Sequence, residues 1–396
     1  MTKLLINIGL IAVCFFIFPG LDVRDVKMTV AVNMALALCL SGLYEGYVKP
    51  VKNKWLYIFL GFSLLSYIVA PNPTLSLMGI NVGYFWIWQP MYHYLVFGLA
   101  LIVITSIPYT LKELQVMLNI AIWCGFIMAL YVILQRFNID QLFDNVGTDN
   151  LGRMAGTVGN PTHVSPFMGM LIPIAFYLRR YFFAVIMLTA IYLTHSQVAI
   201  GATIIGMLAY LGFKNLKVMV SIAGVCLLLI FALAIILKTD LLSMKQLSQR
   251  FDGHQRCMVY HQIIKDVNEK PFKDSGARYP LSGWGMGNFK YTFRFAHIED
   301  ETFKRFVQAH NDYLEVLYNT GIVGLVLFIM TLFVLFRDKF RKFYFQSLGR
   351  MERALLSGFI VICAAACFTF VWQVGTTAYF SIVFAGLLYN SEANNA

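Results

Sequence analysis

Charged residues are scarce in this sequence, at 13% of 396 residues, whereas they make up about a quarter of a typical soluble domain. Hydrophobic residues account for 59% of the chain. A soluble fold has no interior large enough to bury that much apolar surface. The scarcity of charge therefore excludes an ordinary soluble enzyme and predicts an integral membrane protein.

Cysteine is sparse where a disulfide could form. Of the seven cysteines, only Cys257 falls outside the apolar runs, so no disulfide framework is expected. Cys363 and Cys367 stand at i,i+4 spacing, which a metal could use, but two thiols within an apolar helix are expected to pack. His254 and His261 are seven residues apart, wider than the spacing in zinc motifs. We predict no metal and no cofactor.

Apolar runs recur along the chain at a length suited to a bilayer, which a helix crosses with about 20 residues. Their order predicts an all-α integral membrane protein of about 12 transmembrane helices, with one large extracytoplasmic loop late in the chain. The first run lacks a basic cluster and a cleavage site, and is expected to be retained rather than removed as a signal peptide. The expected spans are 3–19, 28–43, 55–70, 91–107, 114–134, 162–178, 181–194, 197–213, 218–237, 321–336, 354–372 and 375–390.

Basic residues gather in alternate loops, the densest of which is 337–353. Because short cytoplasmic loops retain Lys and Arg, this pattern places the N-terminus inside. The formal net charge of +11 is then a signal of topology. A nucleic-acid partner is not expected, since it would need basic residues clustered on one recognition surface.

This topology divides the chain into three parts: about nine transmembrane helices in 1–237, a large outside loop in 238–320, and about three helices in 321–396. The loop has mixed charge and many aromatic residues, so it is expected to fold. A connection of this length usually carries function. We therefore expect the chemistry on the outside face.

All seven histidines fall in expected outside loops or at span ends near them, and most are expected to be ordinary interfacial residues. His310 differs, because it begins the polar run 310–315 that enters an apolar helix. A helix N-terminus disfavours the charged imidazolium. A neutral imidazole can accept a proton, so His310 is a candidate base.

The segment 280–289, which reads PLSGWGMGNF, is rich in glycine. The spacing of Gly283, Gly285 and Gly287 is superficially that of a dinucleotide-binding loop, but no βαβ unit surrounds it. A glycine-rich turn is expected.

Together these motifs resemble the O-antigen ligase and polymerase superfamily. Its signature is a G-x-G-x-x-x-F stretch, then His-Asn-x-x-Leu-Glu, then Gly-Ile-x-Gly entering a span. The resemblance extends over roughly residues 150 to 335. The matching segments are Gly283–Phe289, His310–Glu315 and Gly321–Gly324, with Arg153–Gly156, Gly159–Pro161, and Arg256 followed by Tyr260.

The resemblance implies an inverting transfer of a glycan from undecaprenyl diphosphate to an acceptor hydroxyl, on the periplasmic face of a bacterial inner membrane. An O-antigen ligase with a lipid A-core acceptor is favoured. An O-antigen polymerase and a protein O-oligosaccharyltransferase remain open. The implied partners are an undecaprenyl-diphosphate-linked glycan donor, a lipid or glycan acceptor, and membrane lipids.

Five residues fit the roles that this reaction needs. The acceptor hydroxyl needs a base, for which His310 matches the family motif. The diphosphate leaving group needs guanidinium donors. The candidates are Arg256 first, then Arg153, followed by Arg278 and Arg294.

One segment departs from the family pattern. Residues 193–197 read LTHSQ, and Gln197 stands where relatives commonly have arginine. Glutamine carries no charge and cannot replace an arginine at a diphosphate. Three explanations are open: compensation by His195 or a loop arginine, a different donor, or an inactive protein. We favour compensation and keep Gln197 as a candidate binding residue.

A transporter, flippase or scaffold is the alternative from another class. Transporters usually carry ionisable residues deep in their spans and show matching broken helices in two halves. The expected span centres here are nearly free of Asp, Glu, Lys and Arg. A transferase is therefore favoured.

Overall fold

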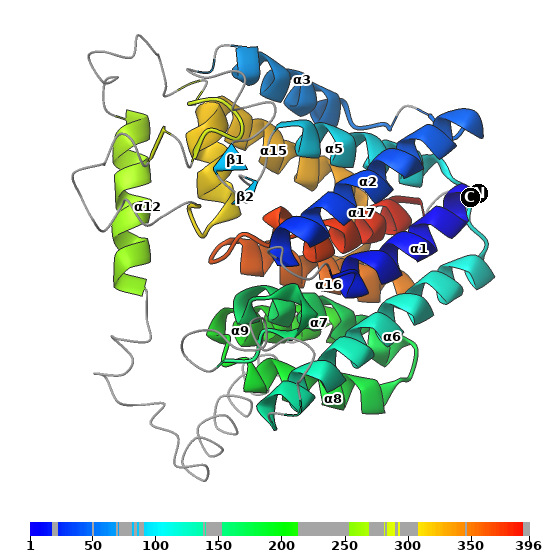
Figure 1. Cartoon of the computed structure of the whole chain (residues 1–396). Coiled ribbons are helices and arrows are strands. Elements are labelled where there is room, and N and C mark those ends of the chain that lie inside the picture. The colour runs from blue at the N-terminus through cyan, green and yellow to red at the C-terminus, as the bar shows by residue number, and fades with distance from the viewer. Residues whose placement is uncertain are drawn as a thin grey trace.

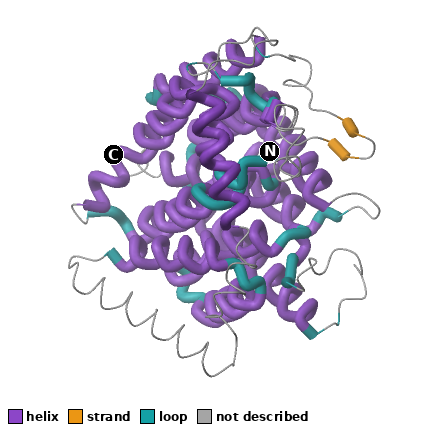
Figure 2. Tube along the Cα trace, turned by 90° about the vertical axis from the view of Figure 1, so that its left-hand side faces the viewer, coloured by secondary structure: helices purple, strands orange, loops and turns teal. Residues whose placement is uncertain are grey.

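The computed structural model is built almost entirely from helices, as Figure 2 shows. It describes residues 1–17, 23–49, 51–68, 70, 81–82, 85–86, 91–137, 139, 153–212, 253–268, 281, 283–289, 292–293, 308–344 and 347–390. Within them a single antiparallel pair of two-residue strands occurs, β1 (Asn81–Val82) with β2 (Phe85–Trp86).

The helices follow the expected spans closely. They are α1 (Thr2–Phe15), α2 (Val23–Tyr44), α3 (Lys54–Ile68), α5 (Met91–Ser106), α6 (Leu111–Arg136), α7 (Pro161–Tyr177), α8 (Tyr181–Leu193), α9 (Gln197–Leu211), α12 (Gly253–Asn268), α15 (Asp312–Tyr344), α16 (Arg350–Ala366) and α17 (Gly375–Asn390), with short 3-10 turns η1 (Gly156–Val158) and η2 (Val371–Gln373). Every expected span overlaps a helix except 218–237, which lies outside the described residues. Segments of α2, α6 and α15 are long and apolar enough to cross a membrane, and α1, α3, α5, α8 and α9 are shorter apolar helices.

Local sequence fixes where several helices begin. Thr110 and Glu113 form a capping box at the start of α6, in which each side chain meets the other residue's backbone N–H. Asn160 caps α7 by accepting the Thr162 N–H at 2.8 Å, and Pro161 occupies the first helical position. The motif Gly159–Pro161 is therefore a helix start.

Apolar side chains cover the outer faces of the helices. On α15, Ile322, Val326, Ile329 and Phe333 recur at helical spacing and are all exposed. Such a continuous apolar stripe is unfavourable in water and suits lipid. The chain is thus a helical membrane protein.

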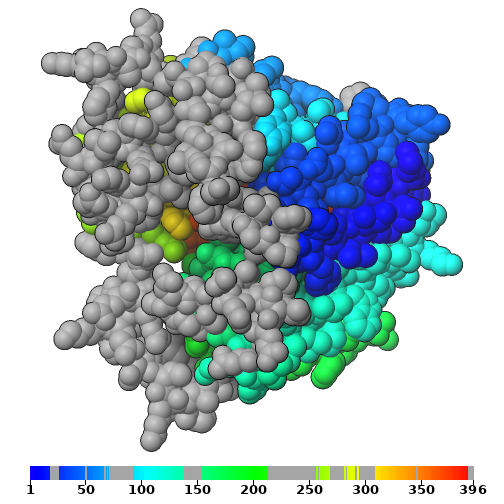
Figure 3. All heavy atoms as spheres, in the orientation of Figure 1, coloured from blue at the N-terminus to red at the C-terminus, as the bar shows by residue number. Residues whose placement is uncertain are grey.

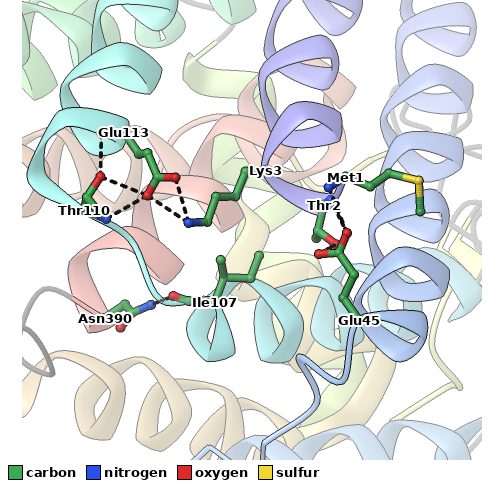
Figure 4. A network of polar contacts seen from close by, with 8 residues as sticks. All are labelled: Met1, Thr2, Lys3, Glu45, Ile107, Thr110, Glu113 and Asn390. Atoms are coloured by element: carbon green, nitrogen blue, oxygen red, sulfur yellow. Dashed lines mark hydrogen bonds and ion pairs between the residues drawn. The ribbon is translucent and has the colours of Figure 1, made fainter.

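The N-terminus and the last turn of α17 lie at the same end of the bundle (Figure 1). There the Met1 ammonium pairs with Glu45 at 2.8 Å, and Lys3 Nζ pairs with Glu113 at 2.8 Å (Figure 4). The Asn390 side-chain amide donates to the Ile107 carbonyl. These contacts join the ends of α1, α2, α5, α6 and α17 that the pattern of basic residues predicts on the inside of the membrane.

Helices α1, α2 and α6 form a continuous face of the bundle (Figure 3). At the end of this face farthest from the termini, Lys27 Nζ donates to the Val13 and Cys14 carbonyls at 3.1 and 2.5 Å. A cation beside the last carbonyls of a helix is electrostatically favourable. Lys27 thereby ties α2 to the end of α1.

Helix α12 lies across the end of the bundle opposite the termini (Figure 1). Its apolar side chains pack with aromatic residues of the glycine-rich segment and of α15. This aromatic cluster contains Val259, Ile263, Trp284, Phe289, Phe293, Ala309 and Tyr318. The described parts of the 238–320 segment are therefore folded onto α15, as their aromatic content predicts.

The glycine-rich segment braces a break in α15. The helix kinks at Gly321, whose φ is 66°. The Trp284 and Gly285 N–H groups donate to the carbonyls of Tyr318 and Asn319, at 3.0 and 2.8 Å. A Cβ on Gly283 would stand 2.4 Å from the backbone of 319–321, so only glycine permits this approach. The segment is the expected glycine-rich turn, and it satisfies carbonyls that the kink frees.

One expected span ends early. The run 354–372 was expected to be one helix, but α16 stops at Ala366 and the chain turns into η2. Side chains take the carbonyls near this end: Asn311 Nδ2 donates to Cys367 at 2.7 Å, and Arg256 Nη1 donates to Phe368 at 3.1 Å. These bonds from distant residues replace a continuing helical ladder, which is why hydropathy alone misplaces the end.

Candidate functional site

His310 lies directly before α15 in a left-handed backbone conformation, with φ at 51°. Its carbonyl accepts the Tyr260 hydroxyl at 2.8 Å. The neighbouring Ala309 N–H donates to Glu315 Oε2 at 3.0 Å, and Asn311 Oδ1 accepts the Leu314 N–H at 3.0 Å. A non-glycine residue stays in this region only when its surroundings hold it there, and such strain is typical of functional positions.

The His310 imidazole is held in its neutral form. Burial, and to a smaller extent the positive charge of Arg256, lower its pKa from 6.5 to about 3. Burial, rather than the α15 terminus on which the sequence argument relied, is the principal cause of the lowered pKa. A neutral ring at pH 7 can accept a proton.

Arg256 reaches the site from α12. Its Nη1 donates to the Phe368 carbonyl at 3.1 Å, while its Nε is buried and has no hydrogen-bond partner among the described residues. A partly exposed guanidinium with an unused Nε–H donor is suited to an anion. Of the two arginine candidates that the structure describes, Arg153 and Arg256, it is Arg256 whose charge acts on His310.

Phe370 joins His310 to a second histidine that the sequence did not single out. The His310 and Phe370 ring centroids are 5.0 Å apart, and those of His163 and Phe370 are 4.5 Å apart, both edge to face. His163 is buried in the first turn of α7, two residues after the Gly159–Pro161 motif. Two segments of the family pattern therefore converge on one aromatic ring.

Arg153 belongs to the segment that precedes η1 and α7. It is partly buried, and Thr157 four residues on donates to the Cys14 carbonyl at 2.7 Å. The Gly156 N–H donates to Gln135 Oε1 at 2.9 Å. These bonds fix the segment at the end of the bundle that also carries His310.

Gln197 is the first residue of α9 and its side chain is exposed. Within the described part of the chain, no hydrogen bond or ion pair joins it to His310, Arg256 or Arg153. His195, one of the residues suggested above to compensate for Gln197, is also exposed and has a φ of 52°. Arg278 and Arg294 lie outside the described residues.

Two buried acids lie beneath the His310 turn. Asp312 accepts the Trp372 backbone N–H and the Gln373 side-chain amide, each at 3.1 Å. Glu315 accepts the Ala309 N–H as described above. Both acids lie in the segment His310–Glu315. No role could be predicted for them from the sequence, because their hydrogen-bond partners come from η2 and from the turn before α15.

An apolar cavity of ≈ 150 Å³ opens next to Asp312. Its walls come from α2, α3, α5, α15, α16 and α17, and Phe59, Phe97, Phe328 and Leu335 are among them. His93, whose buried Nδ1 has no partner in the described residues, lines it together with Asp312 and Trp372. The cavity thus joins an apolar interior to the polar groups below His310.

Across the described residues, no three His, Cys, Asp or Glu side chains are grouped so that they could hold a metal ion. The candidate pair Cys363 and Cys367 serves the end of α16. The Cys363 carbonyl accepts the Tyr313 hydroxyl at 3.1 Å, and the Cys367 thiol donates to that carbonyl at 3.7 Å.

Fold and site together define a polytopic helical membrane protein with a neutral histidine and a guanidinium at one end of its bundle. Residues 182–329 match the family model for O-antigen ligase, which confirms the resemblance to the O-antigen ligase and polymerase superfamily and supports a glycan-transferring enzyme. The match includes Gln197, Arg256 and His310. No curated protein matches the chain.

Proposed function

We propose that this protein transfers a glycan from undecaprenyl diphosphate to an acceptor hydroxyl, with inversion, on the periplasmic face of the inner membrane. The favoured activity is that of an O-antigen ligase with a lipid A-core acceptor. The observation that carries the proposal is the neutral His310 beside Arg256, inside the segment that matches the family.

In the proposed reaction the acceptor oxygen attacks the anomeric carbon while the His310 imidazole takes its proton. The bond from that carbon to the diphosphate oxygen breaks, and the diphosphate leaves with both bonding electrons. Arg256 stabilises the charge that develops on the leaving group, because its Nε–H has no partner among the described residues. Arg153, Arg278, Arg294 and Gln197 are further candidates for binding this diphosphate. The reaction calls on no nucleotide and no metal.

The apolar cavity supports a lipid-linked substrate. Its walls are largely apolar, and cavities of this kind accept apolar groups. Its polar end lies at Asp312, two residues from His310, so an isoprenoid or acyl chain there would keep its head group near the base. A soluble substrate would have no use for such a cavity.

The test is to delete the gene in its native host and to restore it as the wild type, as His310→Ala or as His261→Ala. His261 is the matched control, since it is an exposed histidine on α12, the helix that carries Arg256. Surface glycolipids are separated on gels and the lipid carrier is analysed. Long polymer stranded on the carrier, restored by His261→Ala but not by His310→Ala, supports the ligase.

Other outcomes separate the alternatives. Accumulation of core bearing a single repeat unit would indicate a polymerase. An unchanged profile would point to a protein acceptor. Full rescue by His310→Ala would contradict the transferase mechanism and favour a transporter or scaffold, neither of which needs a base.

A further inference from the structure

We infer that the two buried acids at the start of α15, Glu315 and Asp312, are positioning residues that set the His310 imidazole against Phe370. The inference rests on the proposed function, because it assumes that His310 is the base. We assign neither acid a direct role in proton transfer or in stabilising the leaving diphosphate. Each acts through a neighbouring backbone segment.

Glu315 controls the backbone of the His310 turn. Its carboxylate accepts the Ala309 N–H at 3.0 Å, and its own N–H donates to the Asn311 carbonyl at 3.0 Å. The side chain and the backbone of one residue thus hold both neighbours of His310. This pair of bonds keeps His310 left-handed, a conformation that L-residues rarely adopt.

Asp312 controls the other side of the contact. Its carboxylate accepts the Trp372 N–H and the Gln373 amide, and these two residues follow Phe370 by two and three positions. The Gln373 amide also lies within hydrogen-bonding reach of Glu315. Because both acids stand on one turn of α15, that turn fixes His310 and Phe370 relative to each other.

Burial argues that the acids act by position. Glu315 and Asp312 are 5% and 3% exposed, and Glu315 Oε2 and both Asp312 oxygens accept N–H groups. A general acid or base must reach the substrate. In contrast, small displacements of a catalytic group reduce rate strongly, by about 100-fold for roughly 1 Å.

The test compares Glu315→Ala with Glu315→Gln in the purified full chain in lipid nanodiscs. Glutamine keeps an oxygen that can accept the Ala309 N–H, whereas alanine does not. We expect Glu315→Ala to lower kcat about 100-fold with little change in KM, and Glu315→Gln to stay within about fivefold of wild type. Asp312→Asn, which keeps one acceptor oxygen but places an amide against N–H donors, should fall between them.

A second readout reports on His310 directly. The rate at which diethyl pyrocarbonate modifies His310, measured by mass spectrometry, should change in Glu315→Ala and not in Glu315→Gln. Glu113→Ala is the matched control, because Glu113 also accepts a backbone N–H near a helix start, that of Thr110 at 2.8 Å, but at the opposite end of the bundle. It should leave kcat and the His310 rate unchanged.

Two results would overturn the inference. One is wild-type kcat in Glu315→Ala. The other is loss of kcat in Glu315→Gln with an unchanged His310 rate, which would mean that the carboxyl group takes part chemically. If Glu315→Ala does not fold, Glu315→Asp replaces it, since its shortened side chain should cause the same loss. Full activity in His310→Ala would instead refute the proposed function, so the two failures are distinguishable.

Discussion

Substitution of Gly283 by alanine tests whether the glycine-rich segment braces the kink in α15. The new Cβ would lie 2.4 Å from backbone atoms of Asn319, Thr320 and Gly321. Backbone cannot move aside as a flexible side chain can. The segment is therefore expected to lift away from α15 and to lose the bonds of Trp284 and Gly285 to that helix.

The cost follows from these contacts. Gly283 has a φ of 69°, a left-handed conformation that costs an L-residue about 1–2 kcal/mol. Lifting the segment leaves the two N–H groups and the Tyr318 carbonyl without partners, at about 1 kcal/mol or more each. The Asn319 carbonyl keeps the Ser66 hydroxyl, at 3.2 Å. The variant should lose at least about 3 kcal/mol of unfolding free energy.

The chain offers a matched control in Gly201→Ala. Gly201 is exposed within α9, and a Cβ there would meet nothing within 4 Å. Alanine should be neutral or stabilising by about 0.5–1 kcal/mol, since glycine is a poor helix former. Unfolding of both variants in detergent can be followed with a thiol-reactive dye, because Cys14, Cys39 and Cys124 are buried. Equal stability of the two variants would refute the brace.

Three further predictions concern the site. Because the pKa of His310 is lowered to about 3, its ring stays neutral as pH falls, so kcat/KM should show no acid limb near 6.5. Arg256→Gln removes a charge that lowers this pKa, so the pH dependence of His310 modification by diethyl pyrocarbonate should move upward; a limb at 6.5 in the wild type would contradict both statements. Gln197→Arg should preserve or raise glycan transfer, measured with purified protein and a lipid-linked donor, whereas complete loss would argue against a diphosphate site at the start of α9.

Much of the helical framework is predictable, because lipid imposes a length and a composition on each span. The start of α7 can also be predicted from the sequence, since asparagine is common at the N-cap and proline at the first helical position, as Asn160 and Pro161 are. His310 and Arg256 were identified from their motifs, and the structure brings them together. These features could be predicted because each depends on residues that are close together in the sequence.

Phe370 and His163 were not predictable, because an aromatic residue in an apolar run is indistinguishable by sequence from a packing residue. The end of α16 shows the same limit. No glycine or proline stands between Ala366 and Phe370, and the helix ends because Asn311 and Arg256 take carbonyls near its terminus. Asn311 is 56 positions from Cys367 along the chain and Arg256 is 112 positions from Phe368, so the local sequence does not indicate where the helix ends.

This arrangement gives the motif residues two tasks. Carbonyls at a helix end inside a membrane protein must find donors, since lipid offers none. Asn311 and Arg256 supply donors to α16, and the same bonds hold the His310 turn and α12 against the chain that carries Phe370. Loss of activity in a variant of either residue therefore does not by itself assign it a chemical role. An unchanged stability measured on the same sample is what separates a guanidinium that binds diphosphate from one that only ends a helix.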